Sequence, residues 1–390
     1  MKPTRYDIAI IGGGPIGAAL ALALALPSKG LRICVLANNE PQNKALRPIA
    51  LSHGSQLLLE RLGLWHALSP QTTKILNIHI SEKHALAAVT IKAQELQLPA
   101  LGYVLDYSLL SQCLSQSAQK AHPDFRLGCK VLSLTPNEGG ATVHYLEENQ
   151  AQSLNCRLVI VADGGALIND NPTQHVDYQQ CALTARIGCD HPQPQKAFER
   201  FCQEGPVALL PFGEDLALVG TVSRERAEML MRAEPPIFLQ WVQSCFGSRL
   251  GKFTHLADRA TFPLTLHYQK PGYAHLSKTP IIRIGNAAQR LHPVAGQGLN
   301  LGLRDAWALA RFIQTTEPEA LGSAVTRHQF EKIRHSDRTA SIAFTHGLVR
   351  LFSNDWPILT QARRGALFTL ACFSPARNWL AQRMMHGVYG

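Results

Sequence analysis

The segment that most constrains this chain lies near its N-terminus, where an apolar run leads into a cluster of glycines. The run Asp7–Ile11 predicts a buried strand, and the letters GGGPIG that follow open an Ala- and Leu-rich helix. Gly12, Gly14 and Gly17 match the pattern G-x-G-x-x-G. In that pattern the first glycine makes a tight turn, the second admits a pyrophosphate and the third lets the helix pack on the strand. The segment therefore predicts a nucleotide-binding α/β unit.

The same region has an alternative interpretation. Ile8–Leu26 is an uncharged stretch of 19 residues behind Lys2 and Arg5, which is also typical of a signal peptide or a membrane span. Four glycines and a proline at fingerprint spacing suit neither. A second strand, predicted at Arg32–Leu36, completes a β-α-β unit and favours nucleotide binding.

One expected residue is missing from this unit. The fingerprint normally ends in an acidic side chain about 20 positions on, which binds the ribose hydroxyls. Counted from Gly17, that position holds Ala37 and is followed by Asn38, Asn39 and Glu40. Asn38 is a neutral substitute for the ribose contact, and Glu40 reaching back is the alternative.

A second glycine-rich segment lies late in the chain, with the sequence GNAAQRLHPVAGQGLNLGLRD at 285–305. It follows the apolar run Ile281–Ile284 and leads into an amphipathic helical pattern at Leu299–Phe312. Glycine lets backbone approach a ligand closely, and we expect Gly296, Gly298 and Gly302 to serve this purpose. The helix start offers free N–H groups to negative charge. The segment predicts a loop built for a flat or anionic ligand.

Composition limits the class of protein. With 390 residues, 46% hydrophobic and 17% charged, the chain is long enough for two domains or for one domain with an insertion. Its nine cysteines are scattered, without a C-x-x-C pair or a Cys/His cluster at zinc spacing, so we expect reduced thiols in a cytoplasmic protein and no metal.

The charge pattern points away from nucleic acid. The net charge is +10, but most of the chain lacks the concentrated basic and aromatic pattern of a nucleic-acid surface. The exception is Arg327–Gly390, which has nine Lys or Arg against three Asp or Glu and many large apolar residues. This pattern is typical of a membrane-surface helix or of C-terminal helices packed on the core, and both interpretations stay open.

The order of predicted elements indicates an α/β nucleotide domain interrupted by a sheet domain. Helical periodicity covers Gly54–Leu62 and Tyr107–Ala121. Strands are predicted at Thr73–Ile80, Ala87–Ile91, Phe125–Leu134, Ala141–Tyr145 and Asn155–Val161, and a β-rich stretch at Gln179–Phe262. The predicted nucleotide domain comprises 1–72, 101–178 and 271–325, the sheet domain comprises 73–100 and 179–270, and helices fill 326–390.

Three features together resemble a known family: the N-terminal fingerprint, a strand that ends in Asp163-Gly164, and the late loop and helix. They resemble the FAD-dependent aromatic hydroxylases. The late motif, with RPIAL at 47–51, FERF at 198–201 and FSPAR at 373–377, is similar to the ubiquinone-biosynthesis hydroxylases, above all the branch acting on 2-octaprenyl-6-methoxyphenol. The resemblance implies a Rossmann-like FAD-binding domain, an inserted β-sheet substrate domain and C-terminal helices.

The resemblance also implies an activity. FAD would be the cofactor, NAD(P)H and O2 the co-substrates, and a polyprenylated phenol the substrate, with the chemistry borne by the flavin. Other ubiquinone-biosynthesis proteins are implied partners. Contact of the C-terminal region with the inner face of the cytoplasmic membrane follows from a substrate that lies in the bilayer.

Site residues follow from the resemblance position by position. Those expected at the pyrophosphate are Gly12, Gly14, Pro15 and Gly17. The others are Arg47 and Gln112 near the pyrophosphate and ribityl chain, Val131 near adenine, Asp163 and Gly164 near FAD and NAD(P)H, Asn286 at the ribityl chain, backbone at Gly298, Leu299 and Asn300 at the ring, and His292-Pro293 facing ring and substrate. Ordinary roles stay open for Arg47 as a surface arginine, Gln112 as a helix-surface residue and Asp163 as a turn former. His292 is assigned no acid–base role.

Some positions depart from the wider family. It has Gly-Asp where this chain has Gly285-Asn286, and it often has serine and arginine where this chain has Leu167 and Asp170. The second departure leaves the NAD(P)H contact open. Two alternatives therefore remain, a non-catalytic flavoprotein in a quinone-biosynthesis complex and a flavin dehydrogenase that inserts no oxygen.

Overall fold

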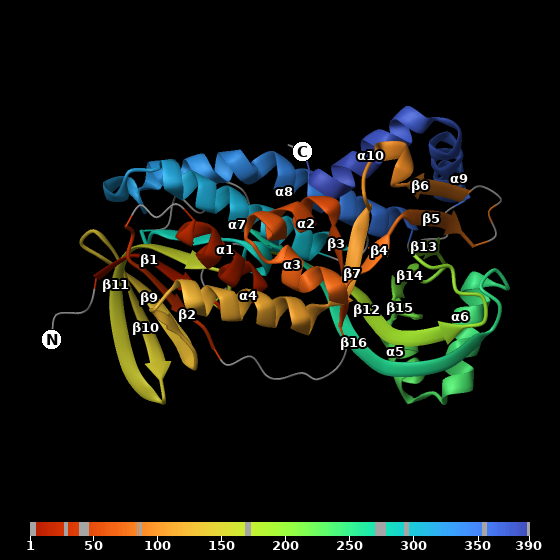
Figure 1. Cartoon of the computed structure of the whole chain (residues 1–390), viewed down its shortest axis with the longest axis horizontal. Coiled ribbons are helices and arrows are strands. Elements are labelled where there is room, and N and C mark those ends of the chain that lie inside the picture. The colour runs from red at the N-terminus through yellow and green to blue at the C-terminus, as the bar shows by residue number, and fades with distance from the viewer. Residues whose placement is uncertain are drawn as a thin grey trace.

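The protein is built on three β-sheets with helices between and around them (Figure 1). A computed structural model describes residues 5–26, 30–38, 47–83, 85, 88–167, 173–269, 278–291, 296–352 and 357–387. Its architecture is the mixed α/β fold expected from the sequence.

A seven-stranded sheet forms the nucleotide-binding part, in the order β8-β2-β1-β11-β10-β9 with β17 beside β11. Its strands are β1 (Arg5–Ile11), β2 (Ile33–Leu36), β8 (Phe125–Arg126), β9 (Cys129–Asn137), β10 (Gly140–Glu147), β11 (Gln150–Val161) and β17 (Ile281–Arg283). β1 pairs in parallel with β2 and β11, and β11 pairs in parallel with β17. The carboxyl ends of these four strands therefore meet at one edge of the sheet.

Alternation along β1 explains how this sheet is buried on both faces. Ile8 and Ile10 pack into one apolar cluster with α1 (Pro15–Ala25), α4 (Tyr107–Ala121) and α7 (Gln297–Thr315). Ala9 and Ile11 pack into another cluster with residues of β9 to β11. The apolar stretch that also suggested a signal peptide or membrane span is thus the first strand and first helix of the core. Among the described residues, no helix is long and apolar enough to cross a membrane.

An eight-stranded sheet has the order β18-β16-β12-β15-β14-β13-β5-β6. Its strands are β5 (Asn77–Glu82), β6 (Ala88–Lys92), β12 (Thr173–Cys189), β13 (Lys196–Phe201), β14 (Pro206–Phe212), β15 (Asp215–Ser223), β16 (Phe253–Gln269) and β18 (Gln289–Arg290). One face packs on α5 (Arg224–Arg232) and α6 (Pro235–Phe246), around the fully buried Phe238.

The sequence analysis described Gln179–Phe262 as a β-rich stretch and did not predict these two helices within it. Local signals account for both. The Ser223 side chain accepts a hydrogen bond from the Arg226 N–H and caps α5, and prolines occupy the first turn of α6. The sequence pattern was obscured because α5 is largely polar.

Two predicted single strands are each split in the structure. Thr73–Ile80 becomes β4 (Thr73–Ile75), in a small sheet with β3 (Pro48–Ser52) and β7 (Gly102–Asp106), and β5 in the large sheet. Phe125–Leu134 becomes β8 and β9, which lie at opposite edges of the seven-stranded sheet. Gly128, with φ of 74°, makes the turn between them. Periodicity along a segment does not report such a change of partner.

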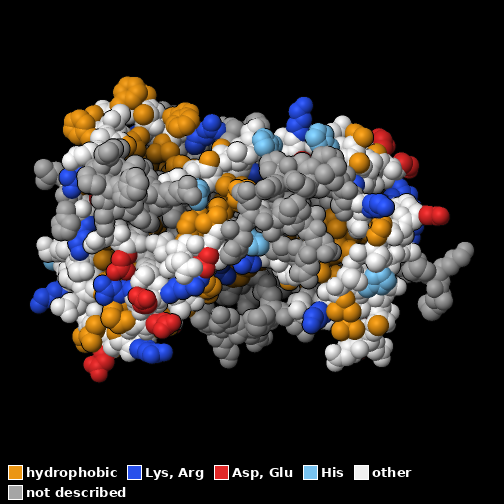
Figure 2. All heavy atoms as spheres, turned by 180° about the vertical axis from the view of Figure 1, so that it is seen from behind, with side chains coloured by type: hydrophobic (Ala, Val, Ile, Leu, Met, Phe, Trp, Pro, Cys, Tyr) orange, Lys and Arg blue, Asp and Glu red, His pale blue; other side chains and the backbone are white. Residues whose placement is uncertain are grey.

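Of the three C-terminal helices, α8 (Ala324–Phe352) runs along α7, whereas α9 (Pro357–Cys372) and α10 (Ser374–His386) lie over β6 and α2 at the other end of the molecule (Figure 1). α2 spans His53–Arg61. Leu367 and Met385 are buried against β6 and its neighbours. On α9, on α10 and between them, Phe368, Trp379 and Phe373 have 62%, 61% and 55% of their surface exposed. Hydrophobic side chains gather at this end of the molecule (Figure 2). These helices therefore pack on the core, as one of the two C-terminal interpretations expects, and they also leave apolar side chains exposed.

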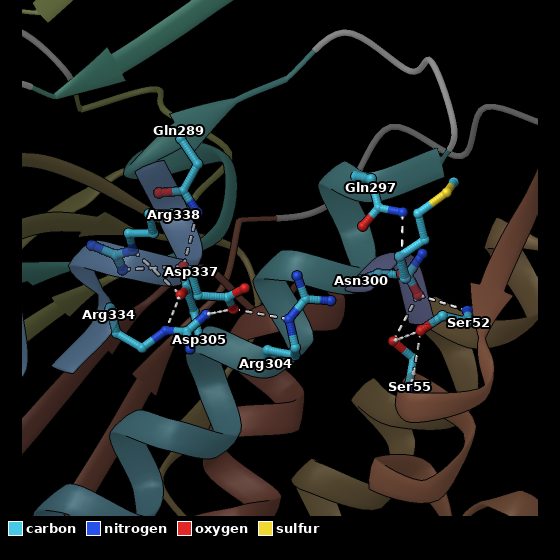
Figure 3. A network of polar contacts seen from close by, with 11 residues as sticks. Ser52, Ser55, Gln289, Gln297, Asn300, Arg304, Asp305, Arg334, Asp337 and Arg338 are labelled. Atoms are coloured by element: carbon cyan, nitrogen blue, oxygen red, sulfur yellow. Dashed lines mark hydrogen bonds and ion pairs between the residues drawn. The ribbon is translucent and has the colours of Figure 1, made fainter. Parts of the chain in front are cut away.

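A buried ionic network fastens α7 to α8 (Figure 3). The fully buried Asp305 accepts hydrogen bonds from Arg334 Nε at 2.7 Å, Arg338 Nη2 at 3.1 Å and Gln289 Nε2 at 2.9 Å. Asp337 Oδ2 accepts from Arg334 at 2.6 Å and from Arg304 at 3.0 Å. Each buried carboxylate thus has its charge matched by arginines, which fixes where the late helix lies.

We expect Asp305→Asn to lower the free energy of unfolding by about 3–5 kcal/mol, because it leaves buried arginine charge uncompensated. The matched control is Asp258→Asn, whose partner Arg186 lies in an exposed ion pair at 3.2 Å and which should cost less than about 1 kcal/mol. Chemical denaturation measures both. Equal losses would contradict a special role for Asp305.

The same carboxylate predicts a pH dependence. Burial alone would raise the pKa of Asp305, but Arg338 and Arg334 outweigh it and hold the pKa below its ordinary value. Its contribution to stability is therefore present above the unfolded-state pKa of about 3.9 and lost as the pH falls through the lower folded-state value. Below about pH 4 we expect the wild-type protein to lose more stability than Asp305→Asn.

Candidate active site

A cavity of about 1210 Å3 opens where the two large sheets meet. The four carboxyl ends described above form one part of it, and the eight-stranded sheet and C-terminal helices form the rest. The sequence-predicted site residues that line it are Gly12, Gly14, Pro15, Asn38, Arg47, Val131, Asp163, Gly164, Asn286, Gly298 and Leu299. Segments far apart in the chain are thus brought to one place.

The glycines of the fingerprint are required by close backbone packing. A Cβ on Gly12 would lie 2.5 Å from the Ala162 carbonyl oxygen, and one on Gly17 would lie 1.9 Å from the Gly12 carbonyl oxygen. Gly17 therefore packs the helix on the turn and does not line the cavity itself. Gly14 is the N-cap of α1 and Pro15 its first residue, so this helix end faces the cavity with N–H groups that have no helical partner.

The end of β2 has no acidic side chain among the described residues. Ala37 is buried, Asn38 is exposed and lines the cavity, and Glu40 lies outside the described residues. Val131 lines the cavity beside Cys129. Burial, followed by the nearby Glu147 carboxylate, raises the pKa of the Cys129 thiol to about 11, so this cysteine is a neutral thiol and no nucleophile at pH 7.

Asp163 forms a turn and also lies at the cavity. Its carboxylate accepts hydrogen bonds from the N–H groups of Gly165 at 2.8 Å and Leu167 at 2.9 Å, so it forms the turn after β11, and it also lines the cavity. Arg290 Nη2 donates to the Gly164 carbonyl oxygen at 2.8 Å and ties the late motif to this turn. Sequence reasoning missed Arg290, although it lies inside the late motif. Asp170 lies outside the described residues.

The late motif begins α7 at Gln297, after Gly296 with φ of 61°. Space is open around the Cα of Gly298, which suits close approach of a ligand, and Leu299 and the exposed Asn286 also line the cavity. Gly302 has a different role from the one expected. A Cβ there would lie 2.8 Å from the Ile16 side chain, so this glycine lets α7 pack closely on α1. His292 and Pro293 lie outside the described residues.

Asn300 holds the start of α7 in position (Figure 3). Its Oδ1 accepts from the Ser52 N–H at 2.9 Å and the Ser55 hydroxyl at 2.6 Å, and its Nδ2 donates to the carbonyl oxygens of Ala50 at 3.1 Å and Gly296 at 2.7 Å. The side chain is buried in these contacts and is not free for a ligand.

Arg47 and Gln112 have different positions. Arg47 lines the cavity with its guanidinium carbon 4.8 Å from the Tyr107 ring centroid and 5.3 Å from that of Phe262. Gln112 is exposed on α4, and the structure does not bring it to the cavity.

The opposite wall of the cavity is the second face of the eight-stranded sheet. It is formed mainly by apolar side chains, among them Ile78, Ile80, Val89, Ile91, Ala197, Phe201, Ala208, Leu210, Val219, Phe262 and Leu264. Among the described residues, this sheet contributes two ionisable side chains to the cavity lining: Arg290 of β18, at the nucleotide end, and Glu199 of β13 within the apolar wall. The motif FERF at 198–201 contributes to the family resemblance, but the sequence did not reveal that its Glu199 carboxyl group lies at the cavity.

The site fits a flavin dinucleotide. A helix N-terminus and glycine turns suit a pyrophosphate, and the open space at Gly298 leaves room for a flat ring. No cluster of three or more metal-ligating side chains occurs within the described ranges. Residues 5–168 match the family described as FAD binding domain. Fold and site therefore define an FAD-dependent aromatic-ring monooxygenase.

Relatives narrow this class. The chain is 33% identical to 3-demethoxyubiquinol 3-hydroxylase of Escherichia coli, covering 93% of both chains. It is 28% identical to ubiquinone hydroxylase UbiL of Rhodospirillum rubrum, covering 97% of this chain and 89% of the relative. The fold is similar to that of p-nitrophenol 4-monooxygenase PnpA from Pseudomonas putida, with a TM-score of 0.75, 16% identity and coverage of 99% and 100%. The chain belongs to the FAD-dependent ubiquinone-biosynthesis hydroxylases.

We expect Gly17→Ala to abolish FAD retention or folding, because the added methyl group overlaps the Gly12 carbonyl oxygen. The control is Gly347→Ala in α8, which has open space around it and should retain FAD and be stabilised by up to about 1 kcal/mol. Flavin absorbance per protein after purification measures retention. Normal flavin content in Gly17→Ala would contradict the role of this close contact.

Proposed function

We propose that the protein hydroxylates the ring of a polyprenylated phenol in ubiquinone biosynthesis, with 2-polyprenyl-6-methoxyphenol as substrate, NAD(P)H as reductant and O2 as oxidant. The observation that carries this proposal is the continuity of the cavity from the glycine turns to an apolar wall. A phenol ring bearing a long apolar chain matches this combination of surfaces. The relatives named for ubiquinone hydroxylation support the same reaction class.

Bound FAD would supply the electron transfer and oxygen activation of the reaction. The chain's own residues would bind the cofactor, orient the substrate ring and exclude water. Arg47 and the turns at Gly12 and Asp163 would hold the cofactor, and the apolar sheet wall would place the ring and keep water away from it. We propose that NAD(P)H contacts the turn between Asp163 and Leu167. Because Leu167 replaces the serine that is frequent in the family, this contact would differ from the usual one.

The C-terminal helices are proposed to contact an anionic membrane surface. Leu367, Leu370, Leu380 and Met384 line the cavity from α9 and α10. Phe368 of α9, Trp379 of α10 and Phe373 between these two helices are the exposed residues described above. Arg383 lies 5.2 Å from the Trp379 ring centroid, beside the apolar surface. Basic and aromatic groups next to a cavity wall suit transfer of a lipid substrate from the bilayer.

The decisive experiment supplies the FAD-loaded protein with short-chain 2-prenyl-6-methoxyphenol, with a short-chain 3-demethoxyubiquinol in parallel, and with NADH or NADPH under labelled O2. We expect one labelled oxygen atom in the hydroxylated methoxyphenol. Labelled oxygen found only in the product of the 3-demethoxyubiquinol would show that this compound, and not the methoxyphenol, is the substrate. Nucleotide oxidation without label would favour a dehydrogenase, and no nucleotide oxidation at all would favour the non-catalytic flavoprotein.

We expect Phe368→Ser and Trp379→Ser each to weaken binding to vesicles of anionic phospholipid by about tenfold or more, since burying a side chain of this size contributes about 1.5–3 kcal/mol. The control is Ile237→Ser, which replaces a hydrophobic residue that is 53% exposed on α6, away from this surface. Flotation of the holoprotein with vesicles measures binding. Equal binding of all three variants and the wild type would contradict the proposal.

A further inference from the structure

The cavity wall contains a carboxyl group in an apolar surface. Glu199 lies on β13, an inner strand of the eight-stranded sheet, between Ile80 of β5 and Ala208 of β14. Ala197 and Phe201, two residues to either side, line the cavity with it. Glu199 therefore projects from the same face of the sheet as the apolar side chains that surround the proposed substrate.

Among the described residues, Glu199 makes no hydrogen bond or ion pair through its side chain, whereas its neighbour Arg200 on the other face donates to the Ser81 hydroxyl at 3.1 Å. Glu199 is half-buried and its carboxyl group lines the cavity, so a ligand there can provide the missing contact. The substrate expected here has one suitable donor, the phenol hydroxyl.

We propose that Glu199 accepts the hydrogen bond of the substrate's phenol hydroxyl and takes its proton as general base, an inference that rests on the proposed function. The O–H bond breaks, the proton passes to a carboxylate oxygen of Glu199, and the electron pair stays on the phenolate oxygen. This step consumes no oxidant. The resulting phenolate has more electron density on its ring carbons, which favours attack on an electrophilic oxygen.

The surroundings suit a base. Burial raises the pKa of the Glu199 carboxyl to about 7, closer to the value of about 10 for a phenol than an ordinary carboxyl is. Glu199 is ionised above that pH and neutral below it. Because the pKa is raised in the folded state, ionisation of Glu199 destabilises the protein as the pH rises through 7.

Other charged groups around the cavity also bear on this pH dependence. Glu82 lies further along β5, Arg377 from α10 is paired with Glu95, and Arg47, Lys130, Asp163 and Arg290 lie at the nucleotide end. On the other face of the sheet are Lys196, Arg200, Arg249 and His79. The shift of Glu199 comes from burial alone.

The test compares Glu199→Gln with Glu214→Gln, the same substitution at an exposed position in the β14–β15 turn of the same sheet. For the FAD-loaded wild type, kcat/KM for hydroxylation should rise with pH through a value near 7. Glu199→Gln should lower kcat/KM by about 10²–10⁴-fold and abolish that rise. Glu214→Gln should keep both.

A binding measurement needs no turnover. A short-chain 2-prenyl-6-methoxyphenol should bind the wild type more tightly than its methyl ether does, and this preference should grow between pH 6 and pH 8 as Glu199 ionises. In Glu199→Gln the preference should not change with pH. Thermal unfolding then shows that the variant is folded, and Glu199→Gln should be more stabilised relative to wild type at pH 8 than at pH 5.

The outcomes separate this inference from the proposed function. No preference for the phenol, a preference independent of Glu199, or an unchanged pH profile of kcat/KM in Glu199→Gln would overturn the role of Glu199. A Glu199-dependent preference for the phenol without labelled product would overturn the proposed hydroxylation and leave Glu199 as the group that binds the phenol.

Discussion

The parallel pairing of β11 with β1 on one side and β17 on the other is the constraint on which the rest of the site depends. It joins strands from the beginning, the middle and the late part of the chain, and their carboxyl ends fall at one edge. The turns after those ends carry the fingerprint, the Asp163 turn and the late motif. Parallel strands place loops in this way, so the register of three strands assembles the cofactor site.

A second constraint is the position of α7. Gly302 lets α7 approach Ile16 of α1, Asn300 binds its start to β3 and α2, and Asp305 binds its flank to α8. The Asn300 and Asp305 contacts are directional hydrogen bonds and the Gly302 contact is close packing, so together they leave little freedom to the loop that begins the helix. The largely apolar face of the eight-stranded sheet completes the cavity, and Glu199 places a carboxyl group in it.

Local sequence patterns predicted the elements that depend on neighbours in the chain. The strand, turn and helix around Gly12 and the helix Tyr107–Ala121 are set by periodicity and by glycine geometry, and the structure contains both. The patterns did not reveal where a strand changes partners, as between β4 and β5 or between β8 and β9. A helix with a largely polar sequence, such as α5, was missed for the related reason that burial on one side is a tertiary property.

The sequence by itself determined that the chain contains a nucleotide-binding unit, a flavin-type late motif and an apolar interior large enough for two sheets, because glycine spacing and hydrophobic alternation are local. Only the tertiary structure decided which residues share the cavity. It brings Arg47 to the site and leaves Gln112 on the surface, gives Gly302 to helix packing, and sets Glu199 in an apolar wall. Those assignments depend on strand register and helix contacts between distant segments, which local patterns do not encode.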